Sequence, residues 1–290
     1  MRPQEHALEH VRSLATGGSV DPSVRVTLNF HPDRIVGGPG GSPILELMTR
    51  DRLYRSQFET GTSNGGLTAY AGGSRWLWES RIFAGAYDEA DAVHRPKYGA
   101  LNFRHRTIGG SPRFGSAHFR LTAGTLSRTT FCYPDSYEEP EHFGVASRVS
   151  TLVALAEADD RGREEVLDDY VEAHVHGELL LDRDVEALVL DPCYRGTFVE
   201  ESANRLGCAV EWHAGFRLSL DELRRHPGYR GPEFVSLGEE IARDGQLDPS
   251  VIGEASRTGR YDEQSLKRVW HYLARFGSDE MPPDNPAVRE

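Results

Sequence analysis

Tyr170-Val-Glu-Ala-His-Val-His176 is the stretch of this sequence that decides the fold. Successive side chains of an extended strand point to opposite faces of a sheet, so Glu172, His174 and His176 are predicted on one face. The apolar residues between them would line the other face and pack against a core. Three ionisable groups are costly to bury alone, so the polar face is expected at a solvated edge, in a metal shell or in a functional cleft.

Other segments repeat the alternation of apolar and polar residues and are predicted as strands: 24–30, 98–103, 116–121, 128–133 and 185–190. Helical spacing predicts helices at 5–16, 74–83 and 145–158, whereas 45–48 and 53–58 resemble short extended pieces. Strands and helices therefore occur in clusters and do not alternate regularly. This order favours an α+β domain over a doubly wound sheet.

The character of the chain changes near residue 196, after which helical patterns dominate. They cover 200–206, 220–226, 234–243, 249–256 and 262–276, with one strand predicted at 208–212. We therefore expect an α+β domain at 1–195 and a mostly helical C-terminal subdomain at 196–276. The last segment, 277–290, combines Pro282, Pro283 and Pro286 with acidic residues and is predicted to be a flexible tail.

Composition limits the classes of protein to consider. The 290 residues are 38% hydrophobic, enough for one ordinary core or two small ones. No apolar run approaches the roughly 18 residues of a membrane span, and no signal core is evident, so cytoplasmic residence is expected, or delivery as an effector without a signal peptide. A net charge of −12 argues against nonspecific binding to nucleic acid or anionic membrane. The three cysteines form no CxxC pair, so no zinc knuckle is predicted.

Two polar segments are candidates for ligand binding. In Tyr54–Gly66, glycines separate the small hydroxyl and amide side chains, a pattern that suits a ligand with phosphate, ribose or amide groups. The alternative is a turn-rich loop whose hydroxyls bond their own backbone. His31 and Arg34 directly follow an apolar strand, a position that often carries catalytic groups, although they could also form a plain polar strand end.

Four stretches look like those of an uncharacterised bacterial family known only as a domain of unknown function: Leu28-Asn-Phe-His-Pro-Asp-Arg34, Tyr54-Arg-Ser-Gln-Phe-Glu-Thr-Gly-Thr-Ser-Asn-Gly-Gly66, Arg95-Pro-Lys-Tyr-Gly-Ala-Leu-Asn102 and Glu172-Ala-His-Val-His-Gly177. Their order also resembles the ADP-ribosyltransferase superfamily, which splits NAD. There a His or Arg ends the first strand, a Ser/Thr or Tyr segment follows, and a Glu begins a late strand. His31, Thr60 to Ser63 or Tyr98, and Glu172 match these roles, and 185–190 matches the strand that comes next.

This resemblance implies a fold and an activity. The fold would be a split pair of small antiparallel or mixed sheets with flanking helices. The activity would be mono-ADP-ribosyl transfer or NAD glycohydrolysis, with NAD as substrate and no metal. Glu172, His31 and Tyr98 would be catalytic, and His174, His176 and Glu59 would lie on the acceptor side. The residues implied in NAD binding are His31, Arg34, Arg55, Ser56, Thr60, Thr62, Ser63, Asn64 and Tyr98.

Physical chemistry supports the role given to Glu172. Breaking the nicotinamide–ribose bond builds an oxocarbenium-like ribose, which a fixed carboxylate stabilises. Arginines could bind the diphosphate, and an aromatic ring could stack on nicotinamide. Many arginine-modifying members carry an acid where this chain has Tyr170, and a register with His174 in the catalytic place would leave the enzyme without its carboxylate. The acceptor (protein, nucleic acid, small molecule or water) and a toxin, defence or housekeeping role stay open.

Two rival readings come from the same residues. His174 and His176, two positions apart on a strand, could bind a metal with Glu172 or with His31, His118 or His213, as in a metal-dependent hydrolase or oxygenase. Alternatively, the helical C-terminal part and the tryptophans could form a non-catalytic interaction module, although scattered Trp residues are more often core. A Ser-His-Asp hydrolase is not supported, because no Gly-x-Ser-x-Gly motif is present.

Overall fold

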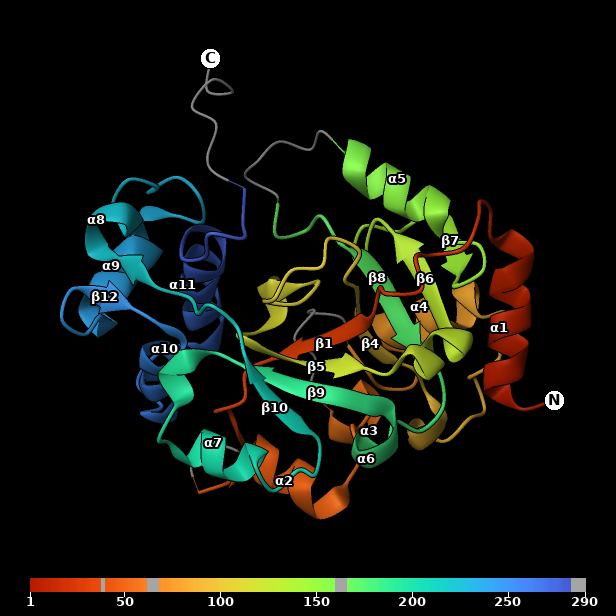
Figure 1. Ribbon diagram of the computed structural model, residues 1–290, viewed down its shortest axis with the longest axis horizontal. Coiled ribbons are helices and arrows are strands. Elements are labelled where there is room, and N and C mark those ends of the chain that lie inside the picture. The colour runs from red at the N-terminus through yellow and green to blue at the C-terminus, as the bar shows by residue number, and fades with distance from the viewer. Residues whose placement is uncertain (38–39, 62–67, 160–165, 283–290) are drawn as a thin grey trace.

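The computed structural model describes residues 1–37, 40–61, 68–159 and 166–282 of the chain. Within these ranges eight strands form one sheet in the order β10-β9-β5-β1-β4-β8-β6-β7 (Figure 1). Their bounds are β1 Val26–Phe30, β4 Lys97–Leu101, β5 Ala117–Leu121, β6 Thr129–Tyr133, β7 His142–Val145, β8 Val171–Val175, β9 Val185–Leu190 and β10 Ala209–Trp212. Neighbours are antiparallel except β9 and β10, which are parallel. The α+β class predicted from the sequence is confirmed.

The register of the central strands fixes what can meet on the polar face. In β8, Glu172 pairs with Ala100 of β4 on one side and with Cys132 of β6 on the other. Ala100 in turn pairs with Thr27 of β1. Glu172 is therefore level with Thr27 across the sheet. Strands β1 and β8 run in the same direction, and His31 lies four residues beyond Thr27, toward the C-terminal ends of both strands.

One face of the sheet packs on the main hydrophobic core. Val171, Ala173 and Val175 of β8 are fully buried there, as the alternation predicts. Helices α2 (Ile44–Asp51), α5 (Ser150–Ala158) and α7 (Phe198–Ala203) contribute apolar side chains to the same core. Burial of this face is the main force that fixes the strand register.

The opposite face is also covered, so its polar residues are not at a solvated edge. Helices α1 (Pro3–Leu14) and α4 (Ser74–Ile82) form a second apolar cluster over β6, β7 and β8. This cluster includes Val11, Trp78 and Phe83 together with Cys132 of β6. His174 and His176 are consequently completely buried, and Glu172 keeps only 6% of its surface exposed.

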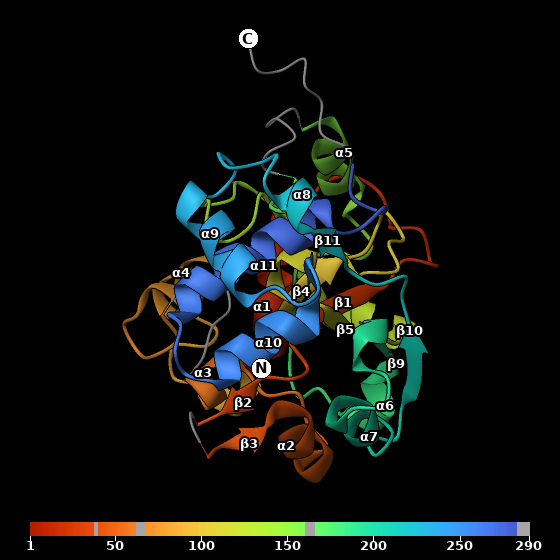
Figure 2. The same ribbon diagram turned by 90° about the vertical axis from the view of Figure 1, so that its left-hand side faces the viewer.

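The C-terminal helices form a third cluster at one end of the sheet (Figure 2). They are α8 (Leu220–Leu223), α9 (Pro232–Ile241), α10 (Pro249–Arg257) and α11 (Glu263–Phe276). Helix α11 rests on the 3-10 turn η2 (Pro112–Phe114), where the Trp270 indole N–H donates to the carbonyls of Pro112 and Arg113. Strand β10 lies beyond residue 195 but belongs to the main sheet, so the two parts of the chain share an element.

Several expectations need correction. The sheet is not split into two small ones, because β1 is hydrogen-bonded on both sides and β4 joins it to β8. Segment 45–48 lies in helix α2, and the short helix α3 (Gln57–Thr60) begins within 53–58. Residues 277–282 are not a frayed tail, because Met281 is buried and Glu280 accepts a hydrogen bond from the Thr107 N–H. Residues 283–290 lie outside the described residues.

The remaining short elements connect these layers. They are α6 (Leu181–Asp184), the strand pair β2 (Ile35–Val36) and β3 (Ser42–Pro43), the pair β11 (Leu218–Ser219) and β12 (Gln246–Leu247), and the 3-10 turns η1 (Ala92–His94), η3 (Ala123–Arg128) and η5 (Pro192–Tyr194). Among the described residues, no helix has the length and apolar character needed to cross a membrane.

Candidate functional site

Glu172 is the centre of a buried polar cluster on the covered face of the sheet. One carboxylate oxygen accepts a hydrogen bond from His174 Nε2 at 3.0 Å, and the other accepts from the Ser136 hydroxyl at 3.0 Å and its N–H at 3.3 Å. The guanidinium of Arg75, on α4, lies 3.9 Å away and donates to the Ser136 hydroxyl. Residues from β8, from the turn after β6 and from α4 therefore fix this carboxylate in place.

A line of hydrogen bonds runs from Glu172 along β8. His174 Nδ1 lies 3.1 Å from the Thr130 hydroxyl, which lies 2.9 Å from His176 Nε2, and His176 Nδ1 lies 2.6 Å from the Tyr87 hydroxyl. An ionised carboxylate only accepts, so His174 Nε2 must carry a hydrogen and each following group must donate toward Glu172. Burial lowers the pKa of both histidines, which keeps them neutral as this arrangement requires.

The charge on Glu172 is maintained despite its burial. Removal from water opposes ionisation, but the hydrogen bond from His174 and the guanidinium of Arg75 outweigh it and lower the pKa of Glu172. The nearby Asp135 shows the opposite effect, because burial and the charge on Glu172 raise its pKa. Two neighbouring carboxyl groups whose pKa values are shifted in opposite directions are typical of sites in which one group stays charged and the other carries a proton.

Tyr98 borders the same cluster from β4. Its ring lies 4.0 Å below the Arg75 guanidinium, and its hydroxyl donates to Glu79 at 2.8 Å. Glu79 in turn forms a buried ion pair with Arg95 at 2.7 Å. The structure thus brings Tyr98 next to His174 and Arg75, with its hydroxyl committed to Glu79.

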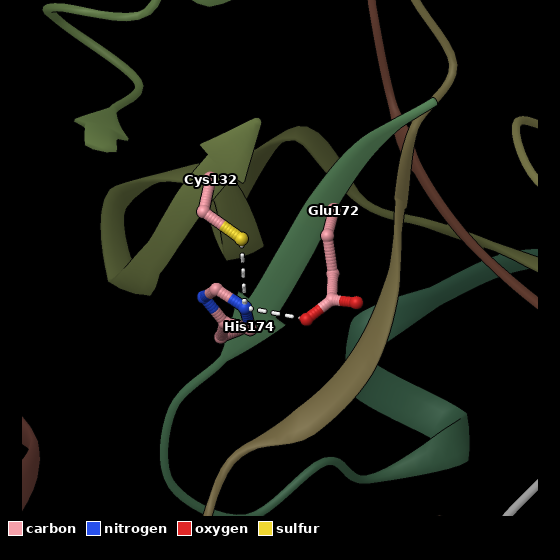
Figure 3. Close-up of side chains that lie close together, drawn as sticks. All are labelled: Cys132, Glu172 and His174. Carbon is pink, nitrogen blue, oxygen red and sulfur yellow. Dashed lines mark hydrogen bonds and ion pairs between the residues drawn. The ribbon is translucent and has the colours of Figure 1, made fainter. Parts of the chain in front are cut away.

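Cys132 of β6 joins Glu172 and His174 in a compact group (Figure 3). Its sulfur lies 3.8 Å from His174 Nε2, and the potential ligand atoms of the three residues all lie within 4.8 Å of one another. His176 is not part of this group, because its ring nitrogens contact Thr130 and Tyr87. The trio that could hold a metal therefore contains Cys132 in the place expected for His176.

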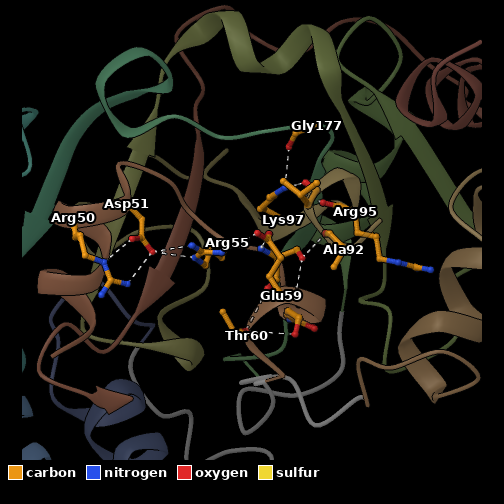
Figure 4. A network of polar contacts seen from close by, with 12 residues as sticks. Arg50, Asp51, Arg55, Glu59, Thr60, Ala92, Arg95, Lys97 and Gly177 are labelled. Atoms are coloured by element: carbon orange, nitrogen blue, oxygen red, sulfur yellow. Dashed lines mark hydrogen bonds and ion pairs between the residues drawn. The ribbon is translucent and has the colours of Figure 1, made fainter. Parts of the chain in front are cut away.

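The segment predicted to bind NAD through its hydroxyls is occupied with its own contacts (Figure 4). Arg55 forms ion pairs with Asp51 at 2.9 Å and with Glu59 at 3.3 Å. Ser56 caps α3 and donates to the Ala92 carbonyl, and the Thr60 hydroxyl donates to backbone carbonyls within α3. These contacts agree with the alternative of a turn whose polar groups satisfy one another.

The position of this segment separates it from Glu172. Lys97, which is buried beside it, donates to the carbonyls of Val93, Arg95 and Gly177 (Figure 4). Gly177 lies two positions beyond the last residue of β8, whereas Glu172 lies at the start of that strand, so the two candidate regions are at opposite ends of β8. Thr62, Ser63 and Asn64 lie outside the described residues.

His31 and Arg34 line a pocket where the sheet meets the C-terminal helices. The His31 ring packs edge-on against Trp270 of α11, with ring centroids 4.8 Å apart, and η2 and α10 complete the walls. The pocket approaches the Glu172 cluster through Phe114, whose ring lies edge-on to that of Tyr170 at 5.6 Å. The Tyr170 hydroxyl donates to Asp135, which precedes the Ser136 that holds Glu172.

The lining of this pocket includes a titratable carboxyl group, that of Asp33. It is 4% exposed, and burial raises its pKa from 3.8 to about 6 although Arg257 lies 3.2 Å away. A carboxyl group whose pKa is raised on folding favours the folded state below pH 3.8, and this contribution is lost as the pH rises through about 6.

We therefore expect wild type to lose about 2 to 3 kcal/mol relative to Asp33→Asn between pH 4 and pH 7. Urea unfolding of both proteins at the two pH values measures this difference. The contributions of the other carboxyl groups are the same in both proteins and cancel. Arg257 is 29% exposed and stays solvated in the variant. The loss of its partner therefore changes the stability of Asp33→Asn by the same amount at pH 4 and at pH 7. A stability difference that does not change with pH would contradict the assignment.

Sequence reasoning missed Arg75, Asp135 and Ser136. Asp135 and Ser136 come one residue after the end of the predicted strand 128–133, so the expectation that strand ends carry catalytic groups, used for His31, also applies to them. Arg75 gave no such signal, because a single basic residue in a predicted helix is usually solvated. Its burial results from the packing of α4 against Tyr98 of β4 and His174 of β8.

Comparison with known proteins adds a family but no activity. A protein-family model described as "Protein of unknown function (DUF3626)" matches residues 25–160 and 150–276. These ranges include the strands of the sheet and the C-terminal helices. No curated protein matches the chain.

Proposed function

Because this chain belongs to the DUF3626 family, whose function is not known, we propose an activity from the site itself: NAD-dependent cleavage of the nicotinamide–ribose bond. ADP-ribose then passes to an acceptor or to water. Nicotinamide leaves with the electrons of the broken bond, and the carbon it leaves carries positive charge in the transition state. The proposal assigns Glu172 to stabilise that charge.

The observation that carries the proposal is that Glu172 is buried, ionised and immobilised at the same time. A fixed carboxylate in a site of low dielectric stabilises positive charge far better than one in water, because no solvent must reorganise. The hydrogen bonds from His174 and Ser136 hold its two oxygens in place. In this proposal His174 and His176 are positioning residues, and the catalytic group is Glu172.

Neighbouring groups suit the rest of the substrate. The Arg75 Nε–H and the Trp78 indole N–H are buried without an acceptor among the described residues. Arg75 is beside Glu172, and the Trp78 ring lies 5.1 Å from that of His174. These two donors could bind oxygen atoms of a ligand, and nicotinamide would lie against the part of the Tyr98 ring that Arg75 does not cover. His31 and Arg34 would bind a more distant part of NAD from their own pocket.

The proposal is tested by incubating the purified chain with NAD and measuring free nicotinamide. Calorimetry of the same sample reports whether NAD binds at all. Saturable binding with release of nicotinamide supports the proposal. Absence of NAD binding by a folded sample would refute it.

A second candidate, a metal-dependent hydrolase, is favoured by the Cys132, Glu172 and His174 group. Ligand atoms around a tetrahedral zinc ion are spaced by roughly 3.3–3.6 Å, given zinc–ligand bonds of 2.0–2.3 Å. The 3.0 Å and 3.8 Å separations on either side of His174 Nε2 lie near that range. A thiolate, a carboxylate and an imidazole with one position open are typical of catalytic zinc.

Elemental analysis separates the two candidates. If zinc is resident, the purified protein should contain about one ion per chain, and Cys132→Ser should reduce this content at least about tenfold, as loss of a ligand does. Cys208→Ser is the matched control, because Cys208 is a partly buried cysteine that does not belong to the trio. Zinc at full occupancy, lost only in Cys132→Ser, would replace the NAD proposal with the hydrolase. Protein without bound metal would leave Glu172 as the catalytic carboxylate.

A further inference from the structure

The pocket between the end of β1, η2 and helices α10 and α11 brings basic side chains together. Arg34 comes from the segment after β1, Arg113 from η2 and Lys267 from α11, and all three line the pocket. The lining thus contains three basic side chains against two acidic ones, in a chain whose net charge is −12. We propose that this pocket binds a phosphate or diphosphate group.

The pocket also contains two acidic residues, but these do not neutralise all of its positive charge. Asp33 forms an ion pair with Arg257. Glu263 is the other acidic residue in the lining, and its side chain is 56% exposed. Its carboxylate lies 3.9 Å from the Arg34 guanidinium, a long distance for an ion pair. Arg113 forms an ion pair with Asp168. A guanidinium has five N–H donors, so such pairs leave donors with which an arginine can bind phosphate oxygens.

Titratable groups around the pocket show the effect of the crowded cations. Burial and the charges of Arg113, Arg268 and Arg34 lower the pKa of Lys267 to about 8. Burial together with Arg34 and Lys267 lowers the pKa of His31 to about 3. An anion placed among these groups would be attracted to several positive charges at once, which is the usual electrostatic basis of phosphate binding.

His271 of α11 feels the charges of the same basic groups but is not part of the pocket lining. His271 of α11 is 1% exposed, and neither of its ring nitrogens has a partner among the described residues. Burial and the charges of Arg113 and Arg230, followed by Lys267, lower its pKa well below the ordinary value, so the ring is neutral. The basic character of the pocket therefore comes from Arg34, Arg113 and Lys267 and not from His271.

The walls of the pocket are firmly held and partly apolar. A Cβ atom at Gly253 of α10 would overlap the Asp33 carboxylate, so the helix packs directly on the strand end. Phe114 and Leu266 supply apolar surface next to the basic groups. This combination suits a phosphate ester whose organic part lies against a ring, as in a nucleotide.

The inference does not require catalysis at Glu172, because it concerns only the pocket. Inorganic pyrophosphate is the probe, titrated calorimetrically into the full chain. Wild type should bind it saturably, and Lys267→Gln and Arg34→Gln should each weaken binding about ten- to hundredfold, the value of one charge-assisted contact. Arg268→Gln is the matched control, because Arg268 is the exposed neighbour of Lys267 on α11 and does not line the pocket.

The outcomes separate this inference from the proposed function. Pyrophosphate binding that depends on Lys267 and Arg34 in a protein that does not cleave NAD supports the pocket and refutes the proposed activity. Competition between pyrophosphate and NAD supports the pocket and assigns the diphosphate of NAD to it. No saturable binding of pyrophosphate by wild type, or equal weakening in Lys267→Gln and Arg268→Gln, would overturn the inference.

Discussion

Glu172→Gln should lower the rate of nicotinamide release from NAD by about 10²- to 10³-fold, the usual cost of removing one preorganised electrostatic contact in a transition state. Glutamine has nearly the same size, but its amide oxygen can accept hydrogen bonds only from the His174 side or from the Ser136 side, because its amide nitrogen only donates. Its main effect is to remove the negative charge that opposes the positive ribose. The dissociation constant for NAD, measured by calorimetry, should therefore change by only a few fold, because the effect belongs to the transition state.

Two further variants make this result interpretable. Glu178→Gln is the matched control, since it makes the same chemical change at an exposed position just beyond β8 and should leave turnover unchanged. Glu172→Asp keeps the charge but withdraws it by one methylene group, so its rate should lie between those of wild type and Glu172→Gln. Equal turnover in Glu172→Gln and wild type would remove the basis of the proposed activity.

Arg95→Met should lower the free energy of unfolding by about 3 to 5 kcal/mol at neutral pH, because it leaves a buried charge without its partner. Glu79 is fully buried and its ion pair with Arg95 has an N···O distance of 2.7 Å. Burial raises the pKa of Glu79 even with Arg95 present. A group with a raised pKa favours folding at low pH and loses that contribution as the pH rises, so the cost of Arg95→Met should shrink in acid.

Chemical unfolding with urea measures this cost, and the chain offers a matched control. Arg50 forms an ion pair with Asp51 at 2.8 Å, but its side chain is 69% exposed, so Arg50→Met should cost at most about 1 kcal/mol. The double variant Arg95→Met with Glu79→Met should recover most of the stability, since neither charge of this pair is then left buried without the other. If Arg95→Met cost no more than Arg50→Met, the ion pair would have no structural importance.

Much of the sheet could be predicted from the sequence, because alternation of apolar and polar residues reports directly on which face is buried. Strand 185–190 has the predicted bounds, and Glu172, His174 and His176 do share one face. The signal is ambiguous in helix α2, because the spacing of Leu45 and Leu47 fits a strand whereas that of Leu45 and Met48 fits a helix. A segment with one fully buried residue gives too little signal to distinguish helix from strand.

The site could be predicted only in part, because its geometry depends on register. Pairing of β6 with β8 places Cys132 beside Glu172, and the turn after β6 then brings Ser136 to the same carboxylate. Pairing of β1 with β4 puts Thr27, and not His31, level with Glu172. Such relations join residues that are tens of positions apart, and the local pattern around each residue does not specify them.

The order of strands in the sheet has a consequence for how the chain reaches its native state. Each central strand pairs with partners distant in sequence: β1 contacts β4 and β5, and β8 returns to lie between β4 and β6. Sheets dominated by such distant contacts fold slowly, because the entropy of closing long loops is lost before strand pairing contributes any stability. During synthesis on the ribosome, the edge of β9 stays unpaired until β10 has emerged. Folding of this sheet is thus completed only when most of the chain has been made.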